Sequence, residues 1–549
     1  MKSTIKYFKV VLLLSVLSFA SCEYNFENVN DNPNKSVESN TSALFSQAIW
    51  NFGYNNYDVW YGGRQSLNAC QQWAQRSYTS EDRYSYRPNV MDGFFRNNYI
   101  YMSNLQKIIE LNTNPTTKDK MLKLYGDNRM QITLAEIVKI WAFQLLTDAF
   151  GDIPYSQALQ LEKYPQPKYD SQKSIYDALL TKLDLQIAML ETLISEEVLG
   201  YEKGDLFYKG DLTKWLKFCN SLKLRLALRA SYNTIRTSGN PDPTYIQIAE
   251  DAIDAGVLSS NGDNAQVHFS AVGAPNEAPI YTGYYTDVRN DFTMTANFID
   301  LLKGNDISLI GFSNPFGGIQ DPRWKIYAGP NYSGSDYSVI PTKVGMPYGL
   351  EDGVAKTVRA NLLSYSPTIS YSLAAKVIRA DFPSTFLDYP TVCFMVSEVE
   401  TFDKNWFLKG VRASLEMWGV PQVDVNPYIQ NVSTKWDAAT TDAQKLELII
   451  TQKYIHLYMQ GYEAWAEYRR TGYPKCLIKP GQKTYKDYIF QPVSGNESGN
   501  DIVARFKYPT SEYTLNKSNV NAALSAQGIA PNGGDAHAVR MWWAGAGKQ

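Results

Sequence analysis

The chain has 549 residues, with 53 Lys or Arg and 55 Asp or Glu, so its formal net charge at pH 7 is −2. This near balance excludes the basic field that nucleic-acid binding requires. Tyrosine is abundant, at 39 residues, and its flat apolar face and hydroxyl suit interfaces and polar ligands.

The first 21 residues predict a signal peptide. Three lysines precede an apolar core over residues 10–19, which is shorter than the ~20 residues needed to span a bilayer. The sequence Phe19-Ala20-Ser21-Cys22 resembles the lipobox of bacterial lipoproteins. We therefore expect Cys22 to carry the lipid and residues 22–40 to form a tethering linker. The alternative is an ordinary secretory signal cut nearby, which would leave Cys22 as a stray thiol.

The first half of the chain predicts paired helices. Apolar spacing indicates helices over 93–111 and, after an Asn-Pro-Thr-Thr turn, over 118–150, and so short a connection makes them antiparallel. The pattern recurs over 171–194 with a Ser cap, over 211–235 with an Asp cap and a basic surface stripe, and over 243–255. Stacked helix hairpins predict a tetratricopeptide-type (TPR-like) solenoid, although no 34-residue consensus repeats.

The middle of the chain predicts a large loop-rich insertion. Residues 256–384 are rich in Gly, Pro, Asn and Tyr, with one short helix expected over 294–302. Helices return over 390–418 and 441–470, and the tail from 479 is expected to be irregular. We therefore expect a mainly α fold in which residues 41–549 form one domain, with a helical scaffold (41–255 and 385–475) and a ligand-facing region (256–384). Long irregular segments in compact proteins are usually functional.

Several motifs resemble those of the SusD/RagB family of outer-membrane nutrient-binding lipoproteins. They are FGDIPYSQAL (150–159), LDYPTVCFMVSEVE (387–400), GYEAWAEYRRTGYP (461–474), and RFKYPTSEYTLNKSNVNAAL (505–524) followed by GGDAHAVRMWWA. The resemblance covers nearly the whole mature chain and implies TPR-like helix pairs that cradle irregular loops. It also implies a lipid anchor in the outer membrane, exposure at the cell surface, and a SusC-like TonB-dependent barrel as partner. The implied ligand is an oligosaccharide or a peptide.

The motifs themselves are typical of packing positions. In the segment 461–470, Trp465 and Tyr468 share one helix face, and we expect both in the core. Because the family's ligand residues lie in variable loops, the resemblance predicts the fold, and the site has to be sought from residue chemistry.

Catalytic and metal-binding motifs are absent from the sequence. Three histidines (His268, His456, His537) share no metal spacing, the cysteines form no CxxC pair, and no GxSxG or HExxH occurs. Two carboxylate pairs, Asp148/Asp152 and Glu398/Glu400, have the residue types a glycosidase needs. With 55 acidic residues such pairs arise by chance, so we predict no enzyme activity, no metal and no cofactor.

Sugar binding requires flat aromatic faces beside amide, hydroxyl and guanidinium groups, and two stretches, 57–86 and 276–290, have this composition. Within them Trp73 is expected to be core. The candidate ligand residues are Trp60, Tyr78, Arg83, Tyr84, Tyr86, Tyr281, Tyr284, Tyr285 and Arg289. The prediction is a binding protein that delivers nutrient to the barrel. The alternatives are a secreted glycan-degrading enzyme and a TPR-type scaffold that binds only protein.

Overall fold

The computed structural model describes residues 40–273, 275–289, 291–328, 345–365, 377–529 and 534–545. The predicted signal peptide and Cys22 lie outside these residues. The main helices of the scaffold are α3 (Thr41–Asn55), α4 (Pro88–Thr113), α5 (Lys118–Tyr125), α6 (Asn128–Phe150), α7 (Gln172–Ser195), α8 (Leu212–Ser231), α10 (Pro243–Asp254), α15 (Tyr389–Val399), α16 (Lys404–Met417), α17 (Gln422–Ala438), α18 (Asp442–His456) and α19 (Gly461–Thr471).

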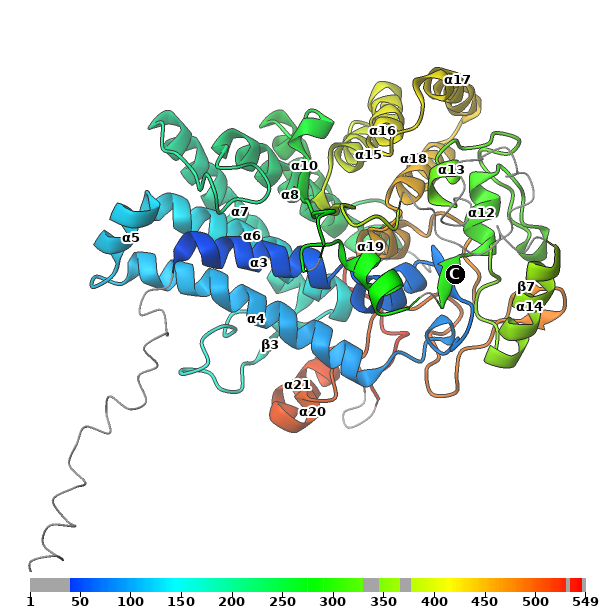
Figure 1. The fold of residues 1–549 in the computed structure, drawn as a ribbon, viewed down its shortest axis with the longest axis horizontal. Helices are drawn as coiled ribbons and strands as arrows, with labels where there is room; N and C mark the ends of the chain where they lie inside the picture. The colour runs from blue at the N-terminus through cyan, green and yellow to red at the C-terminus, as the bar shows by residue number, and fades with distance from the viewer. Residues whose placement is uncertain are drawn as a thin grey trace, which may run out of the picture.

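These helices stack in chain order, as Figure 1 shows from blue to orange. Helix α3 packs against α4, α4 against α6, α6 against α7, α7 against α8, and α8 against α10. A second group follows, in which α15 packs against α16 and α18, and a contact between α15 and α8 joins the two groups. The predicted mainly α, TPR-like solenoid is thereby confirmed.

The predicted helix starts are made by the expected caps. The Ser171 side chain accepts a hydrogen bond from the backbone of Ser174, and Asp211 caps α8 in the same way. The predicted basic surface stripe on α8 is wrong in part. Arg225 and Arg229 are only 5 % and 1 % exposed, because they point into the interior and pair with acidic residues there.

Some predicted helix boundaries are wrong because polar caps look like ordinary surface positions in a periodic pattern. The expected helix 118–150 is divided between α5 and α6, where Gly126 takes a φ of +90° and Asp127 caps the second helix. The expected helix 390–418 is divided in the same way by the Asp403 cap of α16. Helix α17, which has Pro427 in its interior, was not predicted.

The region 256–384 holds short elements rather than loops alone. They include β4 (Ala265–Val267), α11 (Pro279–Tyr281), the π-helical turn η5 (Thr282–Thr286), β5 (Phe292–Met294), α12 (Ala296–Leu302), α13 (Trp324–Tyr327), α14 (Asp352–Tyr365) and the start of β6 (Ser384–Leu387). Only α12 was predicted. The tail also contains helices, α20 (Glu512–Leu515) and α21 (Lys517–Ala526), where irregular structure was expected.

Short antiparallel strand pairs tie distant segments together. Strand β1 (Trp73–Gln75) pairs with β5, and β4 pairs with β6. Two further pairs join β2 (Ile153–Pro154) to β3 (Tyr169–Asp170), and β7 (Lys483–Tyr485) to β8 (Tyr488–Ile489). The loop-rich region is therefore attached directly to the N-terminal part of the scaffold.

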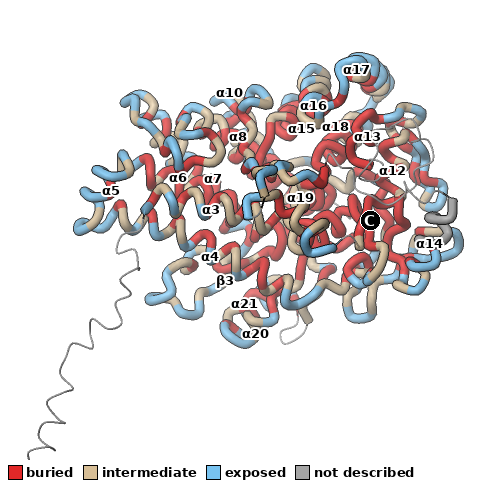
Figure 2. Tube along the Cα trace, in the orientation of Figure 1, coloured by how far each residue is buried: buried red, intermediate tan, exposed pale blue. Residues whose placement is uncertain are grey.

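The core runs continuously through the scaffold and into the loop-rich region (Figure 2). Trp73, Trp465 and Tyr468 are at most 2 % exposed, so the prediction that they are core residues is confirmed. Among the described residues, every helix is too short or too polar to cross a membrane.

Candidate ligand-binding site

The site begins at the π-helical turn η1 (Val59–Leu67), which carries Trp60 and Arg64. The Asp58 carboxylate starts this turn by accepting hydrogen bonds from the backbone nitrogens of Trp60 at 2.8 Å and Tyr61 at 2.5 Å. Burial raises the pKa of Asp58 to about 7, although these hydrogen bonds oppose the rise. The cap therefore holds the position of the tryptophan.

Turn η5 packs directly on η1, more than 200 residues earlier in the chain. Gly283 makes this approach possible, because a Cβ atom there would lie 2.5 Å from Cγ1 of Val59. Next to this contact, the Trp73 ring stacks on Phe292 across the β1–β5 pair, with centroids 4.2 Å apart. The two stretches that the sequence singled out for sugar binding are thus neighbours in the fold.

Three arginines surround the Trp60 ring. The guanidinium carbons of Arg64, Arg87 and Arg289 lie 4.7, 5.4 and 5.4 Å from its centroid. The Glu81 carboxylate binds Arg87 at 2.9 Å and Arg64 at 3.5 Å. Arg289 is exposed, so its planar cation is available at the surface beside the indole.

A tyrosine cluster lies on α11 and η5, the second of which packs on η1. The ring centroids of Tyr281 and Tyr285 are 4.9 Å apart, and those of Tyr284 and Tyr285 are 5.1 Å apart. All three residues are half-buried, so part of each side chain is open to solvent. Trp60, Tyr281, Tyr284, Tyr285 and Arg289 together form what we call the aromatic platform.

The stretch 78–86 is divided among different surroundings and does not join the platform as a unit. Tyr78 is 61 % exposed, and its backbone nitrogen donates to the Asp352 carboxylate. Arg83 donates through Nε to the carbonyl of Gln491. Tyr86 packs against Phe506 and His537 in the C-terminal tail.

Tyr84 requires a correction. Its side chain is 0 % exposed and meets Phe490 edge-to-face at 5.2 Å, so no face of the ring is available to a ligand. The sequence could not show this, because in an irregular loop no periodic pattern tells which side chains point toward the core and which toward solvent. Arg64 and Arg87 were not predicted as site residues. Their positions close to Trp60 in the sequence could have indicated that they contact its ring.

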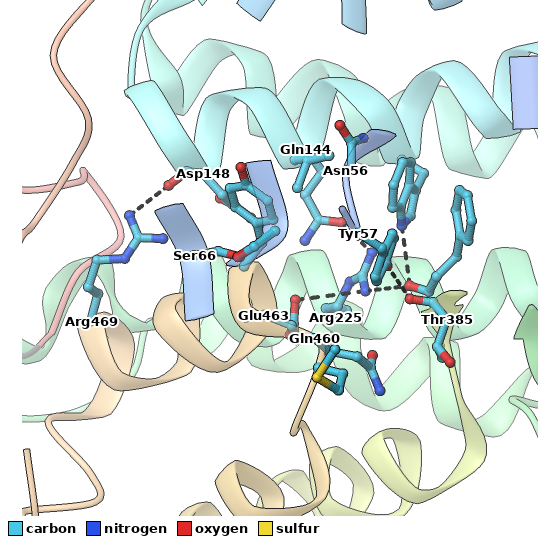
Figure 3. Close-up of a pocket in the computed structure, with 17 residues that line it drawn as sticks. Asn56, Tyr57, Ser66, Gln144, Asp148, Arg225, Thr385, Gln460, Glu463 and Arg469 are labelled. Carbon is cyan, nitrogen blue, oxygen red and sulfur yellow. Dashed lines mark hydrogen bonds and ion pairs between the residues drawn. The ribbon is translucent and has the colours of Figure 1, made fainter. Parts of the chain in front are cut away.

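A small hollow at Tyr57, separate from the aromatic platform, is too small to hold a sugar. It has a volume of about 50 Å³ and is lined by Tyr57, Gln144, Arg225 and Glu463 among others (Figure 3). Arg225 spans it, donating to Gln144 Oε1 at 2.8 Å and to the Phe386 carbonyl at 3.2 Å. A space of this size, with the polar groups of Gln144, Arg225 and Glu463 at its wall, suits a few ordered waters.

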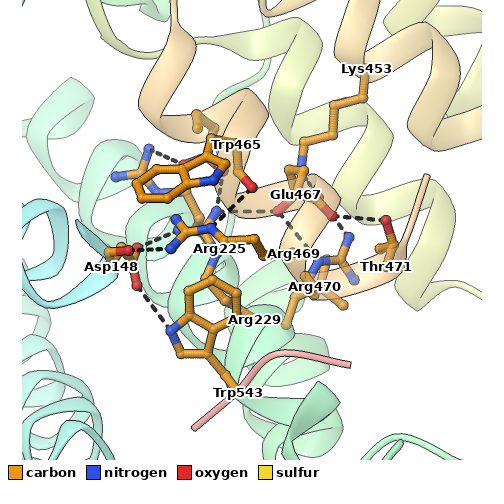
Figure 4. A network of polar contacts seen from close by, with 12 residues as sticks. Asp148, Arg225, Arg229, Lys453, Trp465, Glu467, Arg469, Arg470, Thr471 and Trp543 are labelled. Carbon is orange, nitrogen blue, oxygen red and sulfur yellow. Dashed lines mark hydrogen bonds and ion pairs between the residues drawn. The ribbon is translucent and has the colours of Figure 1, made fainter. Parts of the chain in front are cut away.

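One carboxylate of each candidate catalytic pair, Asp148 or Glu398, is held by an arginine inside the scaffold. Asp148, Arg229, Glu467 and Arg470 are labelled in Figure 4. Arg229 binds Asp148 at 2.6 Å, and Arg470 binds Glu398 at 2.5 Å. Glu467 lies between these arginines; burial alone would raise its pKa, but Arg470 and neighbouring cations hold it well below the usual range. This network joins α6, α8, α15 and α19 and explains the acidic motifs as packing devices.

The chain is similar to known proteins over most of its length. A family model described as "Starch-binding associating with outer membrane" matches residues 33–509. No curated protein gives a match. Solved structures with the same fold include a chitin-binding SusD homologue from Flavobacterium johnsoniae, with 23 % identity, a TM-score of 0.69, and coverage of 92 % of this chain and 100 % of that one.

Two further structures show the same likeness. A SusD homologue from Bacteroides uniformis is 24 % identical, with a TM-score of 0.67 and coverage of 91 % of this chain and 99 % of the other. A SusD-like protein from Bacteroides thetaiotaomicron is 23 % identical, with a TM-score of 0.67 and coverage of 92 % and 99 %. At these identities the structures establish the shared fold.

Proposed function

The chain belongs to the SusD-like family, and on this premise we propose that it is a cell-surface lipoprotein that captures an oligosaccharide on the aromatic platform. It delivers the captured sugar to a SusC-like TonB-dependent barrel and has no catalytic step of its own. The family description names starch binding and outer-membrane association, and two similar structures are named as chitin-binding. The lipid on Cys22 provides the tether to the outer membrane.

The observation that carries this proposal is the arrangement of the platform. Half-buried aromatic rings can stack on the apolar face of a pyranose, and their loss of water contact gives the binding energy. The guanidinium of Arg289 and the tyrosine hydroxyls provide donors for sugar hydroxyls at the edge of the rings. Because η1 and η5 are fixed by Asp58 and Gly283, the platform is preorganised and little ordering entropy is lost on binding.

The binding test is isothermal calorimetry on the chain from residue 23 onward against pools of oligosaccharides and peptides. We expect an oligosaccharide hit whose affinity falls in a Trp60→Ala variant, because that ring supports three arginines and contributes a stacking face. A peptide as the only hit would replace the glycan in this proposal. Turnover of the hit during titration would contradict the proposal and favour the enzyme.

The partner test is purification of the native protein from outer membrane in mild detergent. A stable lid on a barrel buries a large interface, above roughly 2,000 Å² in total, so the barrel should copurify. Recovery of the protein alone in repeated preparations would contradict the delivery role and favour a scaffold or an enzyme.

A further inference from the structure

We propose that a separate cavity is a second carbohydrate site. It takes one sugar unit that bears a carboxylate, such as a terminal uronic acid. The cavity has a volume of about 270 Å³ and lies between the β4–β6 pair, the C-terminal end of α16 and the link from α18 to α19. It shares no described lining residue with the aromatic platform. Ligand cavities usually measure about 300–1,000 Å³, so this one suits a single ring rather than a chain.

One wall of the cavity is aromatic and is held in place from behind. The half-buried rings of Trp418 and Phe382 lie 6.0 Å apart and are inclined by 34°. The Trp418 indole donates to the His456 carbonyl at 3.3 Å, and Tyr327 packs against it in a T-shaped arrangement with the ring centroids 4.6 Å apart. These contacts fix the indole while part of it stays open to the cavity, which is the property that pyranose stacking requires.

Two glutamines provide oriented acceptors beside this wall. Gln266 donates through Nε2 to Thr385 Oγ1 at 2.8 Å, and Gln460 donates through Nε2 to Asp388 Oδ2 at 2.7 Å. With each amide nitrogen engaged, each carbonyl oxygen is positioned to accept from a sugar hydroxyl. Figure 3 shows Gln460 and Thr385 near Tyr57, which also lines this cavity.

The charged rim of the cavity favours an acidic sugar. Arg379 and His268 are both exposed at the rim, and none of the described lining residues is an aspartate or a glutamate. Arg379 pairs with Asp381 at 2.8 Å, but their side chains are 52 % and 51 % exposed, so a ligand carboxylate can displace this weak pair and bind the guanidinium in a bidentate manner. Partial burial, together with the charges of Arg379 and Lys209, lowers the pKa of His268, so the positive charge at the rim comes from the Arg379 guanidinium.

The test uses the imidazole of His268 as a reporter. The chain has three histidines, and His456 and His537 are buried, so the exposed ring gives a resolvable Cε1–H signal in the ¹³C-labelled protein. Glucuronic acid should shift this signal in a saturable way, whereas glucose, which lacks the carboxylate, should bind at least tenfold more weakly. Absence of a saturable shift, or equal affinity for the two sugars, would overturn the proposal.

Variants separate this cavity from the platform. Arg379→Gln removes the carboxylate partner and Phe382→Ala removes part of the aromatic wall; both residues are partly exposed, so circular dichroism should show an intact fold. Each should weaken glucuronic acid at least tenfold, and Arg289→Gln on the platform is the matched control that should leave the shift unchanged. Acetate binding as tightly as glucuronic acid would show a simple anion site and overturn the sugar assignment. The Trp60→Ala variant should lose oligosaccharide capture at the platform but keep the saturable His268 shift with glucuronic acid. This result would support the second site independently of the platform.

Discussion

Replacing Tyr281 by Ala tests the aromatic platform with little risk to the fold. The ring is half-buried and contacts Tyr285 at 4.9 Å, so its loss should cost less than about 1.5 kcal/mol of the free energy of unfolding. If a pyranose covers about 40–60 Å² of this ring, the lost burial is about 1–1.5 kcal/mol at roughly 25 cal/mol per Å². With about 0.5 kcal/mol added for the lost stacking, binding should weaken by about 1.5–2 kcal/mol, which is roughly twelve- to thirtyfold in Kd.

The assay is calorimetric titration of the best oligosaccharide hit, with Tyr468→Ala as the control. Tyr468 is 2 % exposed and donates to Asp501 at 2.8 Å, so its loss should cost about 3–5 kcal/mol of stability and lower the Tm. The control should leave the Kd unchanged, because Tyr468 has no exposed face. An affinity that survives the loss of Tyr281, Tyr284 and Tyr285 together would refute the platform and move the search to the stretch 78–86.

Three further predictions concern the anchor, the scaffold and pH. Cys22→Ala should release the protein from the membrane fraction of cells that lack the barrel, with helical circular dichroism retained; equal retention would contradict the lipid anchor. In a denaturant titration, Arg470→Met should lower the free energy of unfolding by about 3–5 kcal/mol, because Glu398 and Glu467 lose a buried partner. Removing the exposed Lys173–Asp177 pair is the control and should cost less than about 1 kcal/mol. The pKa of Asp58 rises to about 7 on folding, so between about pH 4 and pH 7 the folded state holds a proton that the unfolded state releases. The contribution of Asp58 to the free energy of unfolding therefore falls as pH rises through that window. Asp58→Asn should flatten that fall in urea titrations at pH 4.5 and 7.5, and an unchanged pH slope would contradict the raised pKa.

Helical periodicity and caps predicted most of the scaffold helices, although α17 and the breaks at Gly126 and Asp403 were missed. Ser171 and Asp211 mark helix starts in the sequence and act as caps in the structure, because capping depends only on residues within one turn. The core positions Trp465 and Tyr468 were predicted for a similar reason, since residues three apart on a helix share a face. The family resemblance, which depends on the order of such motifs along the chain, was confirmed by the family match over residues 33–509.

Long-range pairing decided what local patterns could not. Arg225 and Arg229 belong to a basic pattern that is typical of a solvent-facing surface. They are buried because α6 and α19 pack against α8 and provide carboxylates that pair with them. Tyr84 and Tyr281 both stand in tyrosine-containing stretches without a clear period, yet Tyr84 is 0 % exposed and Tyr281 is half-buried.

The candidate site shows the same division between sequence and fold. The composition of the stretches 57–86 and 276–290 indicated the chemistry of sugar binding, but their contact depends on the β1–β5 pair and on Gly283 fitting against Val59. The acceptor glutamines and aromatic wall of the second cavity come from four separate segments, and no local pattern joins them. Side-chain chemistry is a property of the sequence, whereas the meeting of distant segments is a property of the packed chain, because its energy comes from contacts that exist only after folding.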